Sequence, residues 1–193
     1  MSPRIGLDLP TIIQQAADLA NESGLESVTL ASLSQKLGIR SPSLYNHVNG
    51  LGDLKEKLAL HGLTILHDKL LRAAAGRSGD DAVFAIGMAY IGFAREHPGL
   101  YEATLPAQQT EDAQLIKVSE ELVQLIAQVI HFAYAMKEED TIHLVRGFRS
   151  FMHGFASLER SGGFGLPVDL DASIQVVLKA YLAGIKEQFG ISL

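Results

Sequence analysis

Apolar residues recur every three to four positions along nearly the whole chain, and no convincing stretch alternates between apolar and polar residues. The first spacing is typical of an amphipathic α-helix, whereas strict alternation would indicate a β-strand. The pattern therefore predicts an all-α protein of about nine helices. We expect these helices at about residues 9–23, 30–37, 41–48, 51–75, 81–96, 98–105, 111–136, 138–160 and 170–189.

Glycine and polar residues separate the predicted helices. Gly24 and Gly38 are placed to end the first two, because glycine readily adopts the left-handed conformation found at helix C-termini. The segment GRSGDD, 76–81, is the clearest break in composition, and SGGFGLPVD, 161–169, separates the last two helices. We expect an N-terminal helix-turn-helix domain of three helices at residues 6–66 and a C-terminal helical bundle at 67–193.

Residues 29–48, TLASLSQKLGIRSPSLYNHV, have the order of features found in a helix-turn-helix motif. Thr29 is a suitable N-cap for the first helix of the pair. Ser41 is expected to cap the second, with Pro42 at the first helical position, where a missing N–H costs nothing. Ser34 is small enough to let the two helices cross closely. The apolar core expected between them comprises Leu33, Leu37, Ile39, Leu44 and Val48.

The second of these helices would fit a DNA major groove, since seven residues of helix span about 10 Å and the groove is about 12 Å wide. Tyr45 and His47 carry polar tips on rigid rings, which suits hydrogen bonds to phosphate oxygens. The alternative is a three-helix corner with a buried tyrosine and a surface histidine. Residues better placed for base edges are Arg40, Ser41, Pro42, Ser43 and Asn46.

Charge limits the kind of DNA contact that is expected. The 193-residue chain has a net charge of −6, and over residues 1–60 five basic side chains accompany six acidic ones. This balance argues against a long electrostatic groove but not against a compact reader of DNA. Binding would then depend on a few local contacts and on helix dipoles.

Composition also restricts the compartment and the chemistry. The chain has no cysteine, so it offers neither a disulfide nor a thiolate metal site. No run of about 18 apolar residues could span a bilayer, and the N-terminus lacks the apolar core of a signal peptide. We therefore expect a cytoplasmic protein that does not enter a membrane.

The first 60 or so residues resemble the DNA-binding head of the tetracycline repressor (TetR) family of bacterial transcription regulators. The match runs from the apolar first helix through Gly24, Leu25 and Thr29 to LGIRSPSLYNHV and Leu54. Its specificity comes from the turn glycine, the leucine of the recognition helix, and the tyrosine and histidine that follow, all of which stand at family spacing.

One position departs from the family pattern. The family often has a lysine at the start of the fourth helix, where it can touch the phosphate backbone, and this chain has Leu51 there. Lys55 or Lys57 could supply that contact instead. The residues predicted to bind DNA are therefore Thr29, Arg40, Ser41, Pro42, Ser43, Tyr45, Asn46, His47 and Lys55.

The resemblance is weaker over the C-terminal part. There RGFRSFMHGFASLE, 146–159, is similar to a His-Gly motif in the penultimate helix of one branch of the family. The resemblance implies a homodimeric repressor that binds a palindromic double-stranded DNA operator and leaves it when a small effector binds the C-terminal part. It identifies no particular effector.

Small residues spaced by three and four follow one seam of the penultimate helix, and the last helix carries a similar set. Such a seam lets another helix approach closely, so two helices from each of two subunits could form a four-helix interface. The same faces could instead pack within one chain. We favour the dimer, because a helix-turn-helix protein gains from two recognition helices about 34–36 Å apart. The predicted interface residues are Gly147, Ser150, Gly154, Ser157, Ala180 and Gly184.

Bulky apolar residues dominate the other side of the penultimate helix, and they predict a cavity of about 300–1,000 Å³ for a largely apolar effector. Arg149 and His153 would each need a partner if buried, which an acidic or hydroxylated ligand could supply. The same residues could simply fill a helical core, and this interpretation is favoured for any single one. The predicted ligand-binding residues are Met88, Phe93, Phe148, Arg149, Phe151, Met152 and His153.

Motifs for catalysis are lacking. The chain has seven histidines, but the Glu-x-x-His pairs of two-metal helical bundles do not occur, nor does a Gly-x-Ser-x-Gly elbow or a phosphate-binding glycine loop. We therefore predict neither an enzyme nor a metal or cofactor site. The alternative function is a helical module whose helix-turn-helix face binds another protein, and sequence-specific DNA binding distinguishes the two.

Overall fold

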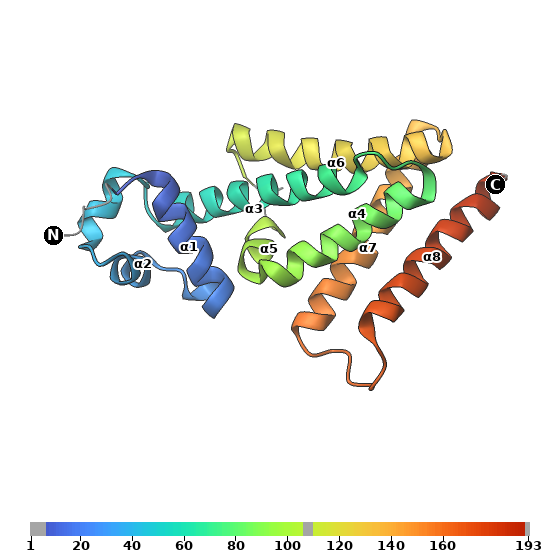
Figure 1. Cartoon of the computed structure of the whole chain (residues 1–193). Coiled ribbons are helices and arrows are strands. Elements are labelled where there is room, and N and C mark those ends of the chain that lie inside the picture. The colour runs from blue at the N-terminus through green and yellow to red at the C-terminus, as the bar shows by residue number, and fades with distance from the viewer. Residues whose placement is uncertain (1–6, 106–109, 192–193) are drawn as a thin grey trace. The chain divides into compact units, whose positions relative to one another are not determined.

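The computed structural model describes residues 7–105 and 110–191, and within them all regular structure is helical. Eight α-helices and two short 3-10 helices, η1 and η2, follow one another along this part of the chain (Figure 1). The all-α prediction is confirmed, and nine helices result when η2 is counted with the α-helices. The elements are α1 (Leu9–Ser23), η1 (Leu25–Ser27), α2 (Leu30–Leu37), η2 (Ser41–Asn46), α3 (Leu51–Ala74), α4 (Gly79–Glu96), α5 (Pro98–Thr104), α6 (Ala113–Tyr134), α7 (Glu138–Arg160) and α8 (Leu170–Phe189).

The expected limits of α1, α2, α7 and α8 coincide with the observed ones, and local caps fix several of them. At the start of α2, the Thr29 hydroxyl accepts the backbone N–H of Ser32 at 3.0 Å, and the Ser32 hydroxyl accepts that of Thr29 at 2.9 Å. Gly38 ends this helix with a left-handed φ of +67°. Asp169 starts α8 by accepting the N–H of Ala172 at 2.7 Å. These side chains satisfy backbone groups that a helix terminus leaves unpaired.

The chain forms two compact units, which are not two continuous segments. The described part of unit 1 contains residues 7–65 together with 96–105 and 110–119. Unit 2 contains residues 66–95 together with 120–191. The chain therefore passes between the units within α3, between Arg95 and Glu96, and within α6. Whether the segments 6–66 and 67–193 are the folding domains stays a prediction.

In unit 1, α1 packs against both α2 and α5. Leu33, Leu44 and Val48 are almost completely buried between the helices, and Leu37 and Ile39 are partly buried. Burying a leucine or valine side chain contributes about 1.5–3 kcal/mol, so this small core is enough to orient the segment that contains Leu44. The buried face of α1 consists of Ile12, Ile13, Ala16, Ala17 and Ala20.

Helix α5 belongs to unit 1 because its first turn is fastened to α1. The Asn21 side-chain oxygen accepts the backbone N–H groups of Gly99 and Leu100, at 3.0 and 3.2 Å. Gly99 is buried, and a Cβ at this position would overlap the backbone carbonyl of Ala20. Only glycine permits this close approach of the two helices.

In unit 2, α4 and α8 run antiparallel (Figure 1). Contacts join the two helices at both ends and in the middle. At one end, the Asp80 carboxylate accepts the Tyr134 hydroxyl at 2.9 Å and the Lys186 ammonium at 2.6 Å. In the middle, α8 lies so close to Gly87 that a Cβ there would be 2.7 Å from Leu178 Cδ2. The pair is therefore held by packing at its centre and by polar contacts at this end.

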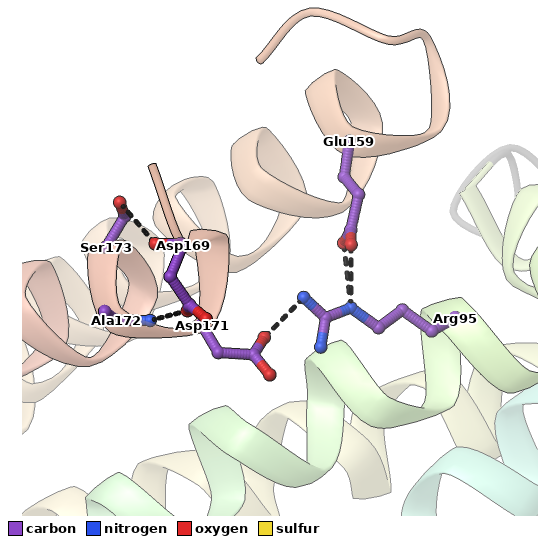
Figure 2. Close-up of polar contacts among 6 residues, drawn as sticks. All are labelled: Arg95, Glu159, Asp169, Asp171, Ala172 and Ser173. Atoms are coloured by element: carbon purple, nitrogen blue, oxygen red, sulfur yellow. Dashed lines mark hydrogen bonds and ion pairs between the residues drawn. The ribbon is translucent and has the colours of Figure 1, made fainter. Parts of the chain in front are cut away.

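Arg95 holds the other end of the pair (Figure 2). Its Nε donates to both carboxylate oxygens of Glu159, at 3.0 and 2.9 Å, and its Nη2 lies 2.7 Å from Asp171 Oδ1. The hydrogen bonds that the Arg95 guanidinium donates to Glu159 raise its pKa above the ordinary value, and those to Asp171 add to this effect. One side chain of α4 thus joins the last turn of α7 to the first turn of α8.

None of the helices in residues 7–105 and 110–191 combines the length and the apolar character needed to cross a membrane.

Candidate nucleic-acid interface

The segment predicted to read DNA is a short 3-10 helix, Ser41–Asn46, rather than an α-helix that extends to residue 48. Leu44 is fully buried, Val48 is 1% exposed and Tyr45 is 60% exposed. Leu44 and Val48 therefore anchor the segment to the rest of unit 1, while the Tyr45 side chain between them extends into solvent. The alternative with a buried tyrosine does not agree with this arrangement.

The expectation that Ser41 caps this segment is wrong. Arg40 occupies the N-cap position and makes no side-chain capping bond. The Ser41 hydroxyl instead lies 2.9 Å from that of Ser34, which is buried in α2. Buried hydroxyls need hydrogen-bond partners, and Ser41 supplies one, so it fastens the segment to α2. Pro42 lies in the first turn, where its missing N–H costs nothing.

The other predicted DNA-binding residues differ in how accessible they are. Ser43 and His47 are half-buried, as is Ser41. Thr29 is exposed, but its hydroxyl belongs to the cap of α2. The residues most open to a ligand on this face are Arg40, Pro42, Tyr45 and Asn46.

We call residues 7–65 the reading head, and each of its lysines forms an ion pair with a carboxylate of the head. This pairing was not foreseen from the sequence, because two of the three pairs join residues 14 or 29 positions apart. Arg40 forms no ion pair within the described part of the chain. The pairs are Lys36–Glu22 at 2.8 Å, Lys55–Glu26 at 3.5 Å, and Lys57–Asp53.

Asp53 has a structural role as well as its ion pair. It lies in the first turn of α3, as expected, and accepts the backbone N–H of Asn49 at 2.7 Å. Burial would raise the pKa of this carboxyl, but hydrogen bonds from Lys57 and Asn49 together outweigh that effect and lower it. Lys57 is therefore paired with a carboxylate that also binds the backbone at the start of α3, which makes it a poor candidate for contact with DNA.

The predicted ligand-binding residues of unit 2 differ in how far they are buried. Phe93, Phe148 and Met152 are fully buried and fill the core, as the alternative interpretation held. Phe151 is 42% exposed, with its ring edge against Tyr181. His153 is exposed, and Met88 and Arg149 are half-buried.

Two of the cavities in unit 2 are lined by residues other than those seven. The larger, of about 990 Å³, is an open groove between the N-terminal end of α4 and the C-terminal half of α8. The smaller, of about 320 Å³, lies between the end of α3, the start of α4 and α6. The larger groove is lined by both charged and apolar groups, which include Asp81, Phe84, Lys179, Leu182, Lys186 and Glu187.

The residues predicted to form a dimer interface lie mostly on the surface. Ser150, Ser157, Ala180 and Gly184 are exposed. Apart from its own helix backbone and chain neighbours, a Cβ at Gly154 would meet no atom of the described residues within 4 Å, whereas one at Gly147 would lie 3.5 Å from the Tyr181 ring. The seam is thus partly used within the chain and partly open. Exposed apolar side chains on the same two helices include Ile142, Phe151, Leu158 and Val176.

Comparison with known proteins identifies the family. Residues 83–181 match the model of the tetracyclin repressor-like C-terminal domain. An uncharacterized helix-turn-helix (HTH)-type transcriptional regulator of Bacillus subtilis (strain 168), YobS, is 40% identical over 186 residues, which cover 96% of each chain. The chain belongs to the TetR family. This TetR family protein is a sequence-specific DNA-binding transcriptional regulator.

Two further likenesses extend over most of the TetR family protein. An uncharacterized HTH-type transcriptional regulator of Mycobacterium tuberculosis (strain ATCC 25618 / H37Rv), Rv0681, is 30% identical over 183 residues, which cover 94% of this chain and 83% of the relative. A protein of unknown function from Rhodococcus sp. RHA1 superposes with a TM-score of 0.82 at 19% identity, over 95% of this chain and 98% of that one. The second likeness concerns the fold alone. TetR-family regulators bind DNA operators, form dimers, bind small-molecule effectors and are typically not enzymes.

Proposed function

We propose that this regulator is a homodimeric repressor that binds a palindromic operator and leaves it when a small, largely apolar effector binds within residues 67–193. The observation that carries the proposal is the η2 segment, where Leu44 and Val48 are buried and Tyr45 is 60% exposed. A short, anchored segment with polar side chains facing solvent suits insertion into a major groove.

The residues proposed to bind DNA are grouped by the contact that each suits. Arg40, Pro42 and Asn46 face base edges in the proposal, through hydrogen bonds or contact with a thymine methyl group. Tyr45, His47 and Lys55 contact phosphates and fix the register of the head on the duplex. Thr29, Ser41 and Ser43 add shorter-range contacts at the starts of α2 and η2. Arg40 is favoured for a guanine, because it forms no ion pair with any carboxylate among the residues that the structure describes, whereas each lysine of the head does.

The proposed dimer pairs α7 and α8 of one subunit with those of another. The open space at Gly154 and the exposed apolar side chains of the two helices support this arrangement. A twofold dimer presents two reading heads related by symmetry, so a palindromic site is the matching operator. We also infer that the protein acts by binding rather than by catalysis, and that it works in the cytoplasm.

Release from DNA requires an effector that binds the DNA-incompetent arrangement more tightly than the competent one. A coupling of about 1–3 kcal/mol would lower operator affinity by several-fold to about a hundredfold. The groove of about 990 Å³ has the size of a small-molecule site. Met88 and Arg149 remain possible contacts for an effector, because neither is completely buried.

The decisive experiment uses the full chain to select binding duplexes from a random library, followed by affinity measurements on the selected duplex. Arg40→Ala is expected to weaken binding by about 1–3 kcal/mol, and Tyr45→Ala is also expected to weaken it. Matched controls are Arg72→Ala and Phe132→Ala, since both side chains are exposed outside the reading head. Failure to enrich any duplex, together with capture of a protein partner by the same face, would favour the protein-binding alternative.

An effector can be sought by its effect on stability. A ligand present at about 100 times its Kd adds about 2.7 kcal/mol to the stability of the state that it binds. Thermal-shift screening of hydrophobic metabolites and drugs, followed by addition of each hit to the protein–duplex complex, tests the proposed release. Hits that stabilise the protein but never displace the duplex would argue against an effector-released repressor.

A further inference from the structure

Each lysine of the reading head is neutralised by a carboxylate of the same head. Lys36 pairs with Glu22, Lys57 with Asp53, and Lys55 with Glu26. DNA affinity that does not depend on sequence arises from lysine and arginine side chains that replace the cations condensed on the phosphates. Because its three lysines are already paired, the reading head should bind DNA of any sequence more weakly than three free lysines would allow.

The three pairs differ in what else holds them. The Asp53 carboxylate also caps α3 through Asn49, and its side chain is only 20% exposed. Lys36 lies in the last turn of α2, where a cation interacts favourably with the helix dipole. The Lys55–Glu26 pair has neither feature. It joins η1 to α3 across 29 positions of sequence.

Within the described residues, the polar contact of the Glu26 carboxylate is this ion pair. Its side chain is 87% exposed, and Lys55 is its polar partner within the described part of the chain, at 3.5 Å. Exposed ion pairs of this kind contribute little to folding. The electrostatic effect on Lys55 remains, since a fixed negative charge beside the ammonium repels an approaching phosphate.

We propose that Glu26 is a built-in counterion of Lys55 that limits phosphate binding by the reading head. This inference rests on the proposed function, in which Lys55 contacts the DNA backbone. In the free protein, the Glu26 carboxylate forms an ion pair with the Lys55 ammonium. On DNA, Glu26 competes with the phosphate, so base contacts carry a larger share of the affinity.

The salt dependence of binding measures the number of phosphates that are neutralised. The slope of log affinity against log salt changes by about 0.9 for each phosphate contact on B-form DNA. Glu26→Gln keeps the shape of the side chain and removes its charge. The variant should bind both the selected duplex and a random-sequence duplex more tightly at 50 mM salt, with a slope steeper by about 0.9 per head. Raising the salt fourfold should then reduce the added affinity about 3.5-fold per head.

Two controls separate this effect from a general change in charge. Glu120→Gln makes the same charge change on an exposed carboxylate of α6 that forms no ion pair in the described part of the chain, and it should leave the slope unchanged. Adding Lys55→Gln to Glu26→Gln should return the slope and the affinity to the values of Lys55→Gln alone. Equal melting temperatures of the variants would show that the fold is intact.

The possible results separate the inference from the function on which it rests. Binding by the wild type with no change in slope or affinity in Glu26→Gln would overturn the role of Glu26 and leave DNA binding in place. A matching change in Glu120→Gln, or a gain that persists without Lys55, would overturn it as well. If the wild type bound neither duplex at 50 mM salt, the proposed function and this inference would both be rejected.

Discussion

At the scale of single residues, His61 of α3 has an unusual environment. Its Nε2 atom is buried and has no hydrogen-bond partner among the residues that the structure describes. Burial lowers the pKa of this imidazole below its ordinary value of 6.5, and His97 lowers it further. At a pH slightly below 6.5, His61 is therefore protonated more readily in the unfolded chain than in the folded protein.

The sign of this linkage gives a prediction for His61→Gln. As the pH falls below 6.5, the unfolded chain binds more protons than the folded protein, so the free energy of unfolding decreases until the folded-state pKa is passed. In His61→Gln, which lacks the imidazole, this decrease in the free energy of unfolding should be absent. The melting temperature of His61→Gln should fall less between pH 7.5 and pH 5.5 than that of the wild type. His143→Gln, at an exposed position of α7, should behave as the wild type does. Equal falls in all three proteins would contradict the assignment.

Gly99 gives a second prediction at this scale, because it allows α5 to touch α1. A methyl group here would overlap the Ala20 carbonyl, and backbone cannot move aside as a flexible side chain can. We expect Gly99→Ala to lower the free energy of unfolding by about 1–3 kcal/mol in urea denaturation. The same change at Gly52, which has open space around it, should be neutral or stabilise by up to about 1 kcal/mol. An unaffected Gly99→Ala protein would mean that the two helices are not in close contact.

At the scale of elements, the sequence predicts helix limits well where the signals are local. Thr29, Gly38 and Asp169 act on backbone groups within a few residues, so their effect can be predicted without knowledge of the fold. Ser41 shows the limit of this approach. Its hydroxyl could form a hydrogen bond with the backbone of η2 or with the buried hydroxyl of Ser34. The second is observed, because the two helices pack with these side chains side by side.

The antiparallel pair of α4 and α8 gives a prediction about Arg95. Its side chain and those of Glu159 and Asp171 are roughly one-third to one-half exposed, so each ion pair contributes about 0.2–1 kcal/mol. Arg95→Gln should therefore lower stability only modestly. Hydrogen exchange should reveal a larger local effect, with faster exchange of the amides in residues 161–173, a segment that follows Glu159 and contains Asp171.

The control for this measurement is Arg72→Gln, which removes an exposed arginine from α3. It should leave exchange in residues 161–173 unchanged. Equal exchange in Arg95→Gln and the wild type would show that the connection between α7 and α8 keeps its order without these contacts, for example through the stacking of Phe155 on Phe164.

At the scale of the whole molecule, the assignment of residues 96–105 and 110–119 to unit 1 could not be read from the sequence. It depends on Asn21 and Gly99, which are 78 positions apart and carry no shared motif. The predicted effector site shows the same difficulty. Aromatic and methionine residues have the same periodicity whether they line a cavity or fill a core, and here Phe93, Phe148 and Met152 fill a core.

The proposed dimer gives the last prediction. Apart from its own helix backbone and chain neighbours, no atom of the described residues lies within 4 Å of a Cβ placed at Gly154, so a leucine there has open space in the single chain. In a dimer with α7 close to its symmetry mate, the same leucine would prevent the approach that a seam of small residues permits. Gly154→Leu should therefore sediment as a monomer under conditions in which the wild type is a dimer.

The control for this experiment is Gln124→Leu, which adds an exposed apolar residue to α6 and should leave the dimer intact. The monomer should also bind the selected palindrome more weakly, because the second head is no longer held near its half-site and must bind independently. A Gly154→Leu protein that remains a dimer would exclude this seam from the interface. The exposed apolar residues Ile142 and Val176, which lie on the same two helices, would then be the next positions to substitute.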